Sequence, residues 1–508
     1  MIAKTFSAAV NGIDADIIEV EVYISSGSPS ITIVGLPDAA VKESKDRVVA
    51  AIKNSGFDFP YQKKIVANLA PADLKKEGGA FDLPLALALL AAVGRIQKDK
   101  LSEFCIIGEL SLEGKIRKGR GLLSIALGLQ KNPLKKLLVP FANRQESAIV
   151  KTIEVFPFKT LAEAAAFINE ELALPPFVYN PDNSQNHFFD SEYDFSDIKG
   201  QRSAKRAAEI SAAGGHNMIM SGPPGAGKTM LAKRIPSILP PMTFEESVET
   251  TKIHSACGQN FGGALIAQRP FRSPHHTSSA VALAGGGVYP KPGEISLAHN
   301  GVLFLDEFAE FRRDALEILR QPLEDRRITV SRAKTTISFP ASFMLVAAMN
   351  PCPCGNFGSY DKECACSAGQ ILRYKNKISG PLLDRIDIHI EVPALRAGEL
   401  ADWTQFSENS QTIRGRIIYA RQIQNMRFKG LKIFSNAQMN VKDIRKYCVM
   451  DEMGKQVLKR AIEKLKFSAR AYDKILKVSR TIADLDKSAL IKSVHIAEAV
   501  QYRSFDRM

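Results

Sequence analysis

The stretch Gly222-Pro-Pro-Gly-Ala-Gly-Lys-Thr229 decides the fold of this 508-residue chain. A short apolar run, His216–Ser221, precedes it, and the helix-like segment MLAKRI follows. Strand, glycine-rich loop and helix in this order match the phosphate-binding loop G-x-x-x-x-G-K-S/T. In such a loop, backbone N–H groups converge on a phosphate and the next helix adds its positive dipole end. We therefore expect a nucleotide site in an α/β domain; the alternative is a glycine-rich turn without a ligand.

The loop residues have separate expected roles in holding ATP and Mg²⁺. The lysine would reach the β- and γ-phosphates, and the threonine hydroxyl would ligate Mg²⁺. The glycines let the backbone approach the β-phosphate. The residues expected to surround the nucleotide are Gly222, Pro223, Pro224, Gly225, Ala226, Gly227, Lys228 and Thr229.

A second motif, Gly301–Glu307 (GVLFLDE), would complete the hydrolytic site. Four apolar residues followed by two acids predict a buried strand that delivers carboxylates to the ligand-binding edge of a parallel sheet. Asp306 would hold Mg²⁺ through water, and Glu307 would orient and deprotonate the attacking water. A strand that ends in two acids is common, so this motif indicates a hydrolytic site only because a phosphate loop precedes it.

Two later segments offer polar groups to the same chemistry. The apolar run Phe343–Met349 ends at Asn350, which could hydrogen-bond the γ-phosphate or the water, or could simply open a turn. Further on, Ser379–Arg385 (SGPLLDR) precedes the strand-like IDIHIEV. An arginine held beside a strand could complete a neighbouring subunit's site as an arginine finger. Without that context, Arg385 would more often form a surface ion pair.

Length and pattern predict several domains, because 508 residues exceed what one hydrophobic core supports. Residues 1–172 alternate short strands with helices, and 173–195 form a linker rich in Pro, Asn and Asp. Residues 196–395 repeat strand, loop and helix, which is typical of a parallel sheet covered by helices. Residues 396–508 have helical periodicity and predict an α-helical domain.

Within the first domain, Ile17–Ile24 and Ile31–Leu36 predict strands, and Leu83–Val93 and Leu122–Leu129 predict buried helices. The longest apolar run, Leu83–Val93, is about half of what a bilayer span needs. The N-terminus has no apolar signal core. We expect a cytoplasmic protein without a membrane partner.

Positive charge is concentrated near the C-terminus. The chain carries a formal net charge of +14, and residues 411–508 hold 22 Lys and Arg against 9 Asp and Glu, an excess of 13. A phosphate-facing surface for nucleic acid would use such a charge. Ordinary lysine-rich helix surfaces are the alternative, and composition does not separate the two.

Four of the seven cysteines form a cluster, Cys352-x-Cys354 and Cys364-x-Cys366. Four thiolates within fifteen positions could hold a structural zinc ion in tetrahedral geometry, at about 2.3 Å from each sulfur. The C-x-C spacing is tighter than the usual one, so free or redox-active thiols remain the alternative. The other three cysteines are expected to be small buried hydrophobes.

These motifs in this order resemble the AAA+ superfamily, specifically the clade of magnesium-chelatase ATPase subunits and MCM helicases. Asp194–Gln201 (DFSDIKGQ) is similar to the segment that enters that fold beside the adenine, which implies nucleotide contacts for Ile198 and Gly200. The resemblance also implies a helical lid after the parallel sheet. Leu382–Arg385 is similar to the finger motif of the clade.

The same resemblance implies two sensors. Asn350 sits where the first sensor lies, and Ser468-Ala-Arg470 is similar to the second, with Arg470 contacting phosphate. The adjacent His275 and His276 tend to point apart and are poor joint metal ligands, so a pore-loop or core role without catalysis is expected.

Two insertions fit this clade. Phe271–Ala298 resembles its helix-2 insert, and Ile328–Phe339 alternates as a hairpin that resembles the one before the first sensor. In helicases of this type both point into the central pore of a ring. The expected turn, Arg332-Ala-Lys334, would let Arg332 and Lys334 hold DNA phosphates. An ordinary surface hairpin is the alternative.

Nearly the full length resembles the ComM/YifB family of magnesium chelatase-like proteins. The segments that carry this resemblance are FRSPHHTSS (271–279), KPGEISLAHNGVLFLDE (291–307), AAMNPCPCG (347–355) and SGPLLDRIDIHIEV (379–392). The family implies a hexameric DNA helicase that promotes branch migration of incoming DNA during natural transformation.

The amino-terminal domain resembles the Lon-type peptidase fold, related to a ribosomal S5 domain, through Lys75–Ala91 (KKEGGAFDLPLALALLA). In active proteases of this type a serine nucleophile lies at the turn and a lysine base follows. The aligned positions here are Ala80 and Leu123, which can perform neither role. We expect a non-proteolytic α+β domain that assists ring assembly or DNA contact.

Three functions remain open from the sequence. An ATP-driven DNA translocase agrees best with the whole-chain resemblance. A chelatase-type chaperone that remodels a protein during metal insertion is disfavoured, because dedicated chelatase ATPase subunits lack this amino-terminal domain. A regulatory AAA+ protein whose hydrolysis only switches its assembly is the third.

Overall fold

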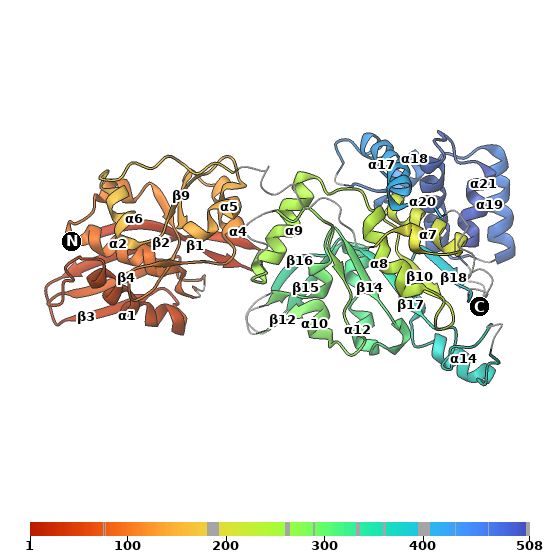
Figure 1. The fold of residues 1–508 in the computed structure, drawn as a ribbon, viewed down its shortest axis with the longest axis horizontal. Coiled ribbons are helices and arrows are strands. Elements are labelled where there is room, and N and C mark those ends of the chain that lie inside the picture. The colour runs from red at the N-terminus through yellow and green to blue at the C-terminus, as the bar shows by residue number, and fades with distance from the viewer. Residues whose placement is uncertain are drawn as a thin grey trace. The chain divides into compact units, whose positions relative to one another are not determined.

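The computed structural model describes residues 1–74, 76, 78–179, 193–259, 265–287, 290–331, 336–358, 362–394, 407–431, 433–465 and 467–503. The chain forms two compact units, Met1–Asn186 with Ser247–Ile266, and His187–Glu246 with Ala267–Met508 (Figure 1). Most of the predicted linker, 180–192, lies outside the described residues. Among the described helices, none has the length and apolar character of a membrane span.

The first unit is built on a seven-stranded mixed sheet of order β3-β4-β2-β1-β5-β8-β9. β1 and β2 form a long antiparallel hairpin, and β5, β8 and β9 extend it in parallel. The strands are β1 (Ile2–Asn11), β2 (Asp14–Ser25), β3 (Ser30–Val34), β4 (Lys64–Ala70), β5 (Phe104–Ile106), β8 (Lys136–Pro140) and β9 (Glu154–Phe158), beside the short pair β6 (Glu109–Leu110) and β7 (Ile116–Arg117).

The helices of this unit cover the sheet. α2 (Asp82–Val93) has ten consecutive buried residues from Leu83 to Ala92, as expected for a helix that is apolar on all sides. The others are α1 (Ala39–Asn54), α3 (Lys98–Leu101), α4 (Leu122–Gln130), α5 (Arg144–Ala148) and α6 (Leu161–Ile168). The predicted strands and buried helices of this region are confirmed by β2, β3, α2 and α4.

A segment between the two nucleotide motifs packs with this first unit. It contains most of α9 (Phe244–Ala256). The Ser255 hydroxyl donates to Glu146 at 2.5 Å, and Lys252 pairs with Asp14 at 2.6 Å. No sequence pattern predicted this placement.

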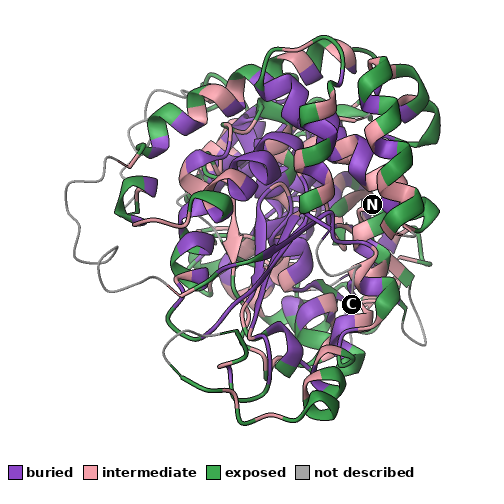
Figure 2. Cartoon of the chain, turned by 90° about the vertical axis from the view of Figure 1, so that its right-hand side faces the viewer, coloured by how far each residue is buried: buried purple, intermediate pink, exposed green. Residues whose placement is uncertain are grey.

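The second unit has a five-stranded parallel sheet of order β11-β14-β17-β10-β18. Its inner strands are buried on both faces, which is why they are almost wholly apolar (Figure 2). The five strands, in sheet order, are β11 (Phe271–Arg272), β14 (Val302–Leu305), β17 (Met344–Met349), β10 (Met218–Ser221) and β18 (Ile388–Glu391), of which β11 and β18 are the edges. The helices of this α/β part are α7 (Arg202–Gly214), α8 (Lys228–Ile238), α12 (Arg313–Glu317), α13 (Arg320–Asp325), α14 (Ala368–Lys375) and α15 (Gly380–Leu383).

The first predicted insertion begins later than expected. Phe271–Arg272 is the edge strand β11 of the central sheet and does not belong to the insert. The insert itself is α10 (Ala280–Ala284), β12 (Gly285–Gly286), β13 (Lys291–Pro292) and α11 (Glu294–Leu297). The second insertion is an antiparallel hairpin of β15 (Arg327–Ser331) and β16 (Thr336–Pro340), as predicted.

The C-terminal region is helical, as predicted. Its helices are α17 (Ser410–Arg427), α18 (Val441–Tyr447), α19 (Glu452–Leu465), α20 (Ala469–Leu485) and α21 (Ser493–Gln501). Buried charges connect them: the Asp484 carboxylate accepts from Arg427 at 2.5 Å and from Arg480 at 3.1 Å. Part of the positive charge of this region therefore lies inside the fold.

Candidate active site

The phosphate loop lies between the carboxyl end of β10 and the start of α8, at the edge where parallel sheets bind ligands. A Cβ atom on Gly222 would lie 2.1 Å from the Val392 carbonyl oxygen, so this position needs glycine. Gly225 and Gly227 have φ angles of +79° and +84°, the left-handed region that favours glycine. The local fold thus explains each glycine of the motif.

Lys228 lies within this loop. Its ammonium donates to the carbonyls of Gly222 at 2.6 Å and Pro223 at 3.0 Å, and to the Asn350 side-chain oxygen at 3.3 Å. Burial lowers the pKa of Lys228, an effect that Asp306 opposes. The structure therefore brings the predicted lysine and the predicted first sensor together.

The two predicted Mg²⁺ residues also meet. The Thr229 hydroxyl donates to Asp306 at 2.7 Å, and the other carboxylate oxygen of Asp306 accepts the Glu307 N–H at 2.9 Å. A carboxylate beside the threonine hydroxyl can hold a water ligand of a Mg²⁺ ion that the hydroxyl ligates directly. The oxygen pair fits a magnesium site.

Glu307 has a partner that the sequence did not indicate. Its carboxylate pairs with Nδ1 of His276 at 2.9 Å, while its own backbone has a φ angle of +51°. The His276 ring packs against His275 and the edge of Phe311. The sequence predicts a pore or core role for both histidines and rings that point apart; instead the two rings pack together and His276 contacts Glu307.

The adenine-side segment reaches the loop through its last residue. The Gln201 amide donates to the Ala226 carbonyl at 3.2 Å and the Pro393 carbonyl at 2.7 Å. Gly200 precedes it with a φ angle of +57°. The side chain of Ile198 is buried in the hydrophobic core of the unit, and its carbonyl accepts from Lys205.

Arg385 lies before the amino end of β18, whereas the phosphate loop follows the carboxyl end of the neighbouring strand β10. β10 and β18 are parallel, with Met218 beside Ile388 and Ser221 beside Glu391. Arg385 precedes this register and Gly222 follows it, so about four residues of strand, roughly 13 Å, separate the two levels. The arginine is therefore far from the phosphate loop of its own chain.

Arg470 lies close to Arg385, because both pair with the same carboxylate. Both guanidinium groups pair with Glu324 of α13, Arg385 at 2.6 Å and Arg470 at 3.4 Å. The three side chains line a cavity of about 380 Å³, together with Lys474 and Lys477. The structure unites the predicted finger and the predicted second sensor, and separates both from Lys228.

Asp387 anchors the loop that carries Arg385. It is buried and pairs with Lys474 of α20, and it also contacts His216 at 3.2 Å. Although burial opposes ionisation, Lys474 and His216 hold the pKa of Asp387 far below its usual range. Lys474 also donates to the Arg385 carbonyl at 3.3 Å, which ties the finger loop to the helix that carries Arg470.

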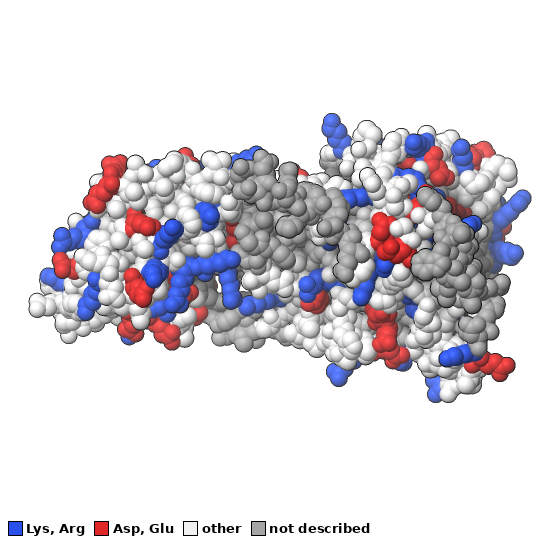
Figure 3. Space-filling model, in the orientation of Figure 1, with Lys and Arg blue, Asp and Glu red and all other residues white. Residues whose placement is uncertain are grey.

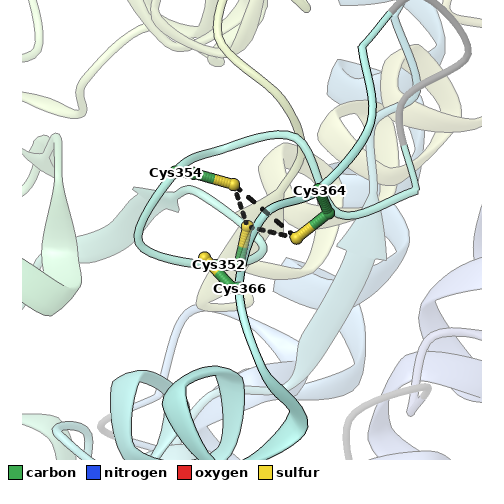
Figure 4. Close-up of side chains that lie close together, drawn as sticks. All are labelled: Cys352, Cys354, Cys364 and Cys366. Atoms are coloured by element: carbon green, nitrogen blue, oxygen red, sulfur yellow. Dashed lines mark hydrogen bonds between the residues drawn. The ribbon is translucent and has the colours of Figure 1, made fainter.

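The four clustered cysteines converge after β17 (Figure 4). Their sulfurs lie within 4.8 Å of one another, with Cys352 3.4 Å from Cys354 and 3.6 Å from Cys364. Zinc–sulfur bonds of about 2.3 Å place the sulfurs of a tetrahedral site roughly 3.8 Å apart. Cys366 completes the group, so the arrangement fits one metal ion.

Backbone N–H groups point at these sulfurs. The N–H of Phe357 donates to Cys352 at 3.3 Å. The N–H of Asn356 lowers the pKa of Cys354 to about 6, helped by the Cys352 thiol. Although a backbone N–H also favours the Cys364 thiolate, desolvation and the neighbouring thiols raise the pKa of Cys364 to about 12. A bound cation would remove this conflict among the four sulfurs.

The positions of the missing protease dyad are apolar. Leu123 is fully buried in a hydrophobic cluster, and Ala80 packs against that same cluster. Two buried acids of this unit have partners of their own: Asp82 pairs with Arg47 at 2.7 Å and accepts from Ser44, and Glu146 accepts the N–H of Leu123 at 3.3 Å. The residues at the two aligned positions thus form part of a core.

The predicted DNA contacts remain predictions. Arg332 and Lys334, which follow β15 in the sequence, lie outside the described residues. On the face shown in Figure 3, basic and acidic side chains are interspersed over both units. Several C-terminal cations are engaged internally, among them Arg427, Arg480 and Lys474.

Comparison with known proteins assigns the family. Residues 194–400 match the family model of magnesium chelatase, subunit ChlI; 407–503 match its C-terminal model, and 20–143 match the model of subunit ChlI of Mg-chelatase. Competence protein ComM of Haemophilus influenzae is 44% identical, over 100% of this chain and 98% of that protein. YifB of Escherichia coli is 44% identical over 98% and 96%.

A partial relative lies outside this group. The DNA replication licensing factor mcm7 of Schizosaccharomyces pombe is 26% identical over 29% of this chain and 16% of its own length. The magnesium chelatase model covers both the phosphate loop and the strand that ends in Asp306 and Glu307. The chain belongs to the ComM/YifB family of magnesium chelatase-like AAA+ ATPases.

Proposed function

We propose that this protein is a ring-shaped, hexameric ATPase that hydrolyses ATP at the boundaries between its subunits and uses the energy to move DNA branches. The observation that carries the proposal is the separation of Arg385 and Arg470 from the phosphate loop of their own chain. Two cations held at the far edge of the sheet are useful to hydrolysis only if a second subunit presents its nucleotide to them.

The residues of one chain would divide the work as follows. Backbone groups of the loop and Lys228 hold the phosphates, while Thr229 and Asp306 hold Mg²⁺. When bound, Mg²⁺ neutralises phosphate charge. Glu307 accepts the proton of the attacking water, and Asn350, 3.3 Å from the Lys228 ammonium, orients the γ-phosphate or the water.

The neighbouring subunit would supply the remaining charge. Its Arg385 stabilises charge that develops on the transferred phosphoryl group, and such a finger contributes about 10³–10⁵ in kcat. Arg470 shares its carboxylate partner Glu324 and its cavity, so we assign Arg470 to the same neighbouring site. Glu324 would hold both cations together before the nucleotide arrives.

DNA is the proposed object of the motor. One relative that matches the full chain is named a competence protein, and one partial relative is a DNA replication licensing factor. We infer a cytoplasmic role in recombination, including integration of incoming DNA in natural transformation. Arg332 and Lys334 at the hairpin tip would bind the phosphate backbone in the central pore.

Zinc is the proposed occupant of the cysteine cluster. Four sulfurs leave no open coordination position, so the role would be structural. The amino-terminal domain would lack protease activity, because Ala80 and Leu123 stand at the positions of the serine and lysine.

Branch migration on a Holliday-type junction and strand displacement on a fork, each with ATP, test the proposal. Replacing Arg332 and Lys334 with Ala should leave DNA-independent ATP turnover intact. If both side chains contact phosphates, the slope of log K against log salt should fall by about 1.8 on duplex DNA. Intact ATP turnover without any movement of DNA would refute the DNA role and favour a protein-remodelling or regulatory ATPase.

A further inference from the structure

The cysteine cluster lies directly beside the catalytic machinery in the chain. Cys352 comes two residues after Asn350, at the end of β17, and Cys366 comes one residue before Ser367, which caps α14. If the four sulfurs bind one ion, the ion would therefore fix the segment that leaves β17 relative to the first residues of α14.

The loop of the cluster also rests on the phosphate loop. A Cβ atom on Gly355 would lie 2.8 Å from Cδ and 2.9 Å from Cγ of Pro224, and 4.0 Å from Cγ of Asn350. Gly355 has a φ angle of +81°, and its N–H donates to the Cys352 carbonyl at 3.0 Å. The turn between the cysteines is thus in direct contact with Pro224.

α14 returns to the same site from the other end of the loop. The backbone N–H of Asn350 donates to the hydroxyl of Tyr374 in this helix, and Tyr374 is buried. Lys377, just after the helix, pairs with Glu310 at 2.9 Å. The Glu310 N–H donates to the Glu307 carbonyl at 2.7 Å, so this chain of contacts ends at the proposed catalytic glutamate.

We propose that the metal held by Cys352, Cys354, Cys364 and Cys366 controls ATP hydrolysis by bracing Asn350 and Pro224 in their working positions. The inference rests on the proposed ATPase function and deepens it. A misplacement of about 1 Å of a positioning group can cost about 100-fold in rate. Loss of the ion should therefore reduce kcat, while the loop that binds the nucleotide remains present.

Metal removal is the first test. The full-length protein, purified without chelator, should contain one zinc per chain by elemental analysis. Release of that zinc with a mercurial reagent, followed by removal of the reagent with thiol in the presence of EDTA, should lower kcat at least ~10-fold, in line with the misplacement argument. The affinity for a fluorescent ADP analogue should change less than ~3-fold, and re-addition of Zn²⁺ should restore turnover.

A matched pair of glycine variants separates the contact from the metal. Gly355 and Gly358 have φ angles of +81° and +75°, so alanine strains the backbone similarly at both. Only at Gly355 would the new Cβ meet Pro224; at Gly358 it meets nothing within 4 Å. Both variants keep all four cysteines, so both should retain zinc. Gly355→Ala should lower kcat at least ~10-fold, and Gly358→Ala less than ~2-fold.

The outcomes distinguish this inference from the proposed function. Absence of zinc, full turnover by zinc-free protein, or equal turnover of the two glycine variants would overturn the inference and leave the ATPase proposal standing. A wild-type protein that contains zinc and binds ADP but does not hydrolyse ATP would overturn both. ATP turnover that depends on zinc without DNA movement would support the inference and refute only the DNA role.

Discussion

Replacing Asp387 with Asn should destabilise the protein and uncouple the finger loop from the lid. Asp387 is 2% exposed, and its carboxylate pairs with Lys474 and His216. Removing one partner of a buried ion pair costs about 3–5 kcal/mol. The Lys474 side chain is 20% exposed and can recover some hydration, so we expect the lower end, about 3 kcal/mol.

This loss converts to a measurable shift. The folded unit that contains Asp387 has about 300 residues. Its unfolding entropy is therefore about 0.6 kcal/mol/K, so about 3 kcal/mol lowers the melting temperature by about 5 °C. Because the pKa of Asp387 is depressed, its contribution is present above the usual carboxyl range and is lost only as the pH falls through its folded value in strong acid. The deficit of the variant should therefore be the same at pH 6 and pH 8.

Circular dichroism melts of nucleotide-free protein would measure the shift, and Asp384→Asn serves as the control. Asp384 lies in the same loop but is partly exposed, so its replacement should change the melting temperature by less than about 2 °C. ATP turnover of Asp387→Asn should also fall at a temperature where it remains folded, with nucleotide affinity retained. A melting temperature within 2 °C of wild type would refute the reasoning.

Three further substitutions test the nucleotide site. Lys228→Ala should abolish binding of a fluorescent nucleotide, and retained binding would remove this lysine from the site. Glu307→Gln should bind ATP normally but release phosphate at least ~100-fold more slowly, since the amide cannot accept the proton; normal single turnover would argue against its role. His276→Ala removes the half-exposed contact with Glu307, which is worth about 0.5–1 kcal/mol. If this contact restrains Glu307, its loss should raise DNA-independent turnover about 2–5-fold. His275→Ala, whose partner is Thr277, should not, and an unchanged rate in both would show that the contact does not restrain Glu307.

The parts of the site that sequence could predict are those where chemistry demands particular residues at contiguous positions. The phosphate loop needs glycines at positions with particular backbone angles, a lysine and a hydroxyl, so eight adjacent residues were enough to predict it. The acidic strand was recognisable because a buried strand must be apolar until it reaches the ligand edge. The first strand of the motif was expected from His216, but β10 begins at Met218, because the preceding polar side chains serve as buried anchors.

The parts that could not be predicted join distant and ordinary residues. Glu324 has no local signature, yet it gathers Arg385 and Arg470 from two other elements. The contact of His276 with Glu307 depends on how an insert folds back. β11 has only two residues, too few for any periodicity, so Phe271 and Arg272 were assigned to the insert. The contact of Gly355 with Pro224 likewise follows only from the path of the loop.

Mixing two inactive variants tests most directly whether hydrolysis occurs between subunits. Lys228→Ala lacks a working phosphate loop but keeps its finger, and Arg385→Ala has the opposite defect. In rings assembled at random from equal amounts, about a quarter of the boundaries pair an intact loop with an intact finger. Each variant alone should hydrolyse ATP at background rate, and the mixture should recover up to about a quarter of wild-type turnover. A mixture as inactive as its components, in rings shown to contain both chains, would contradict the account.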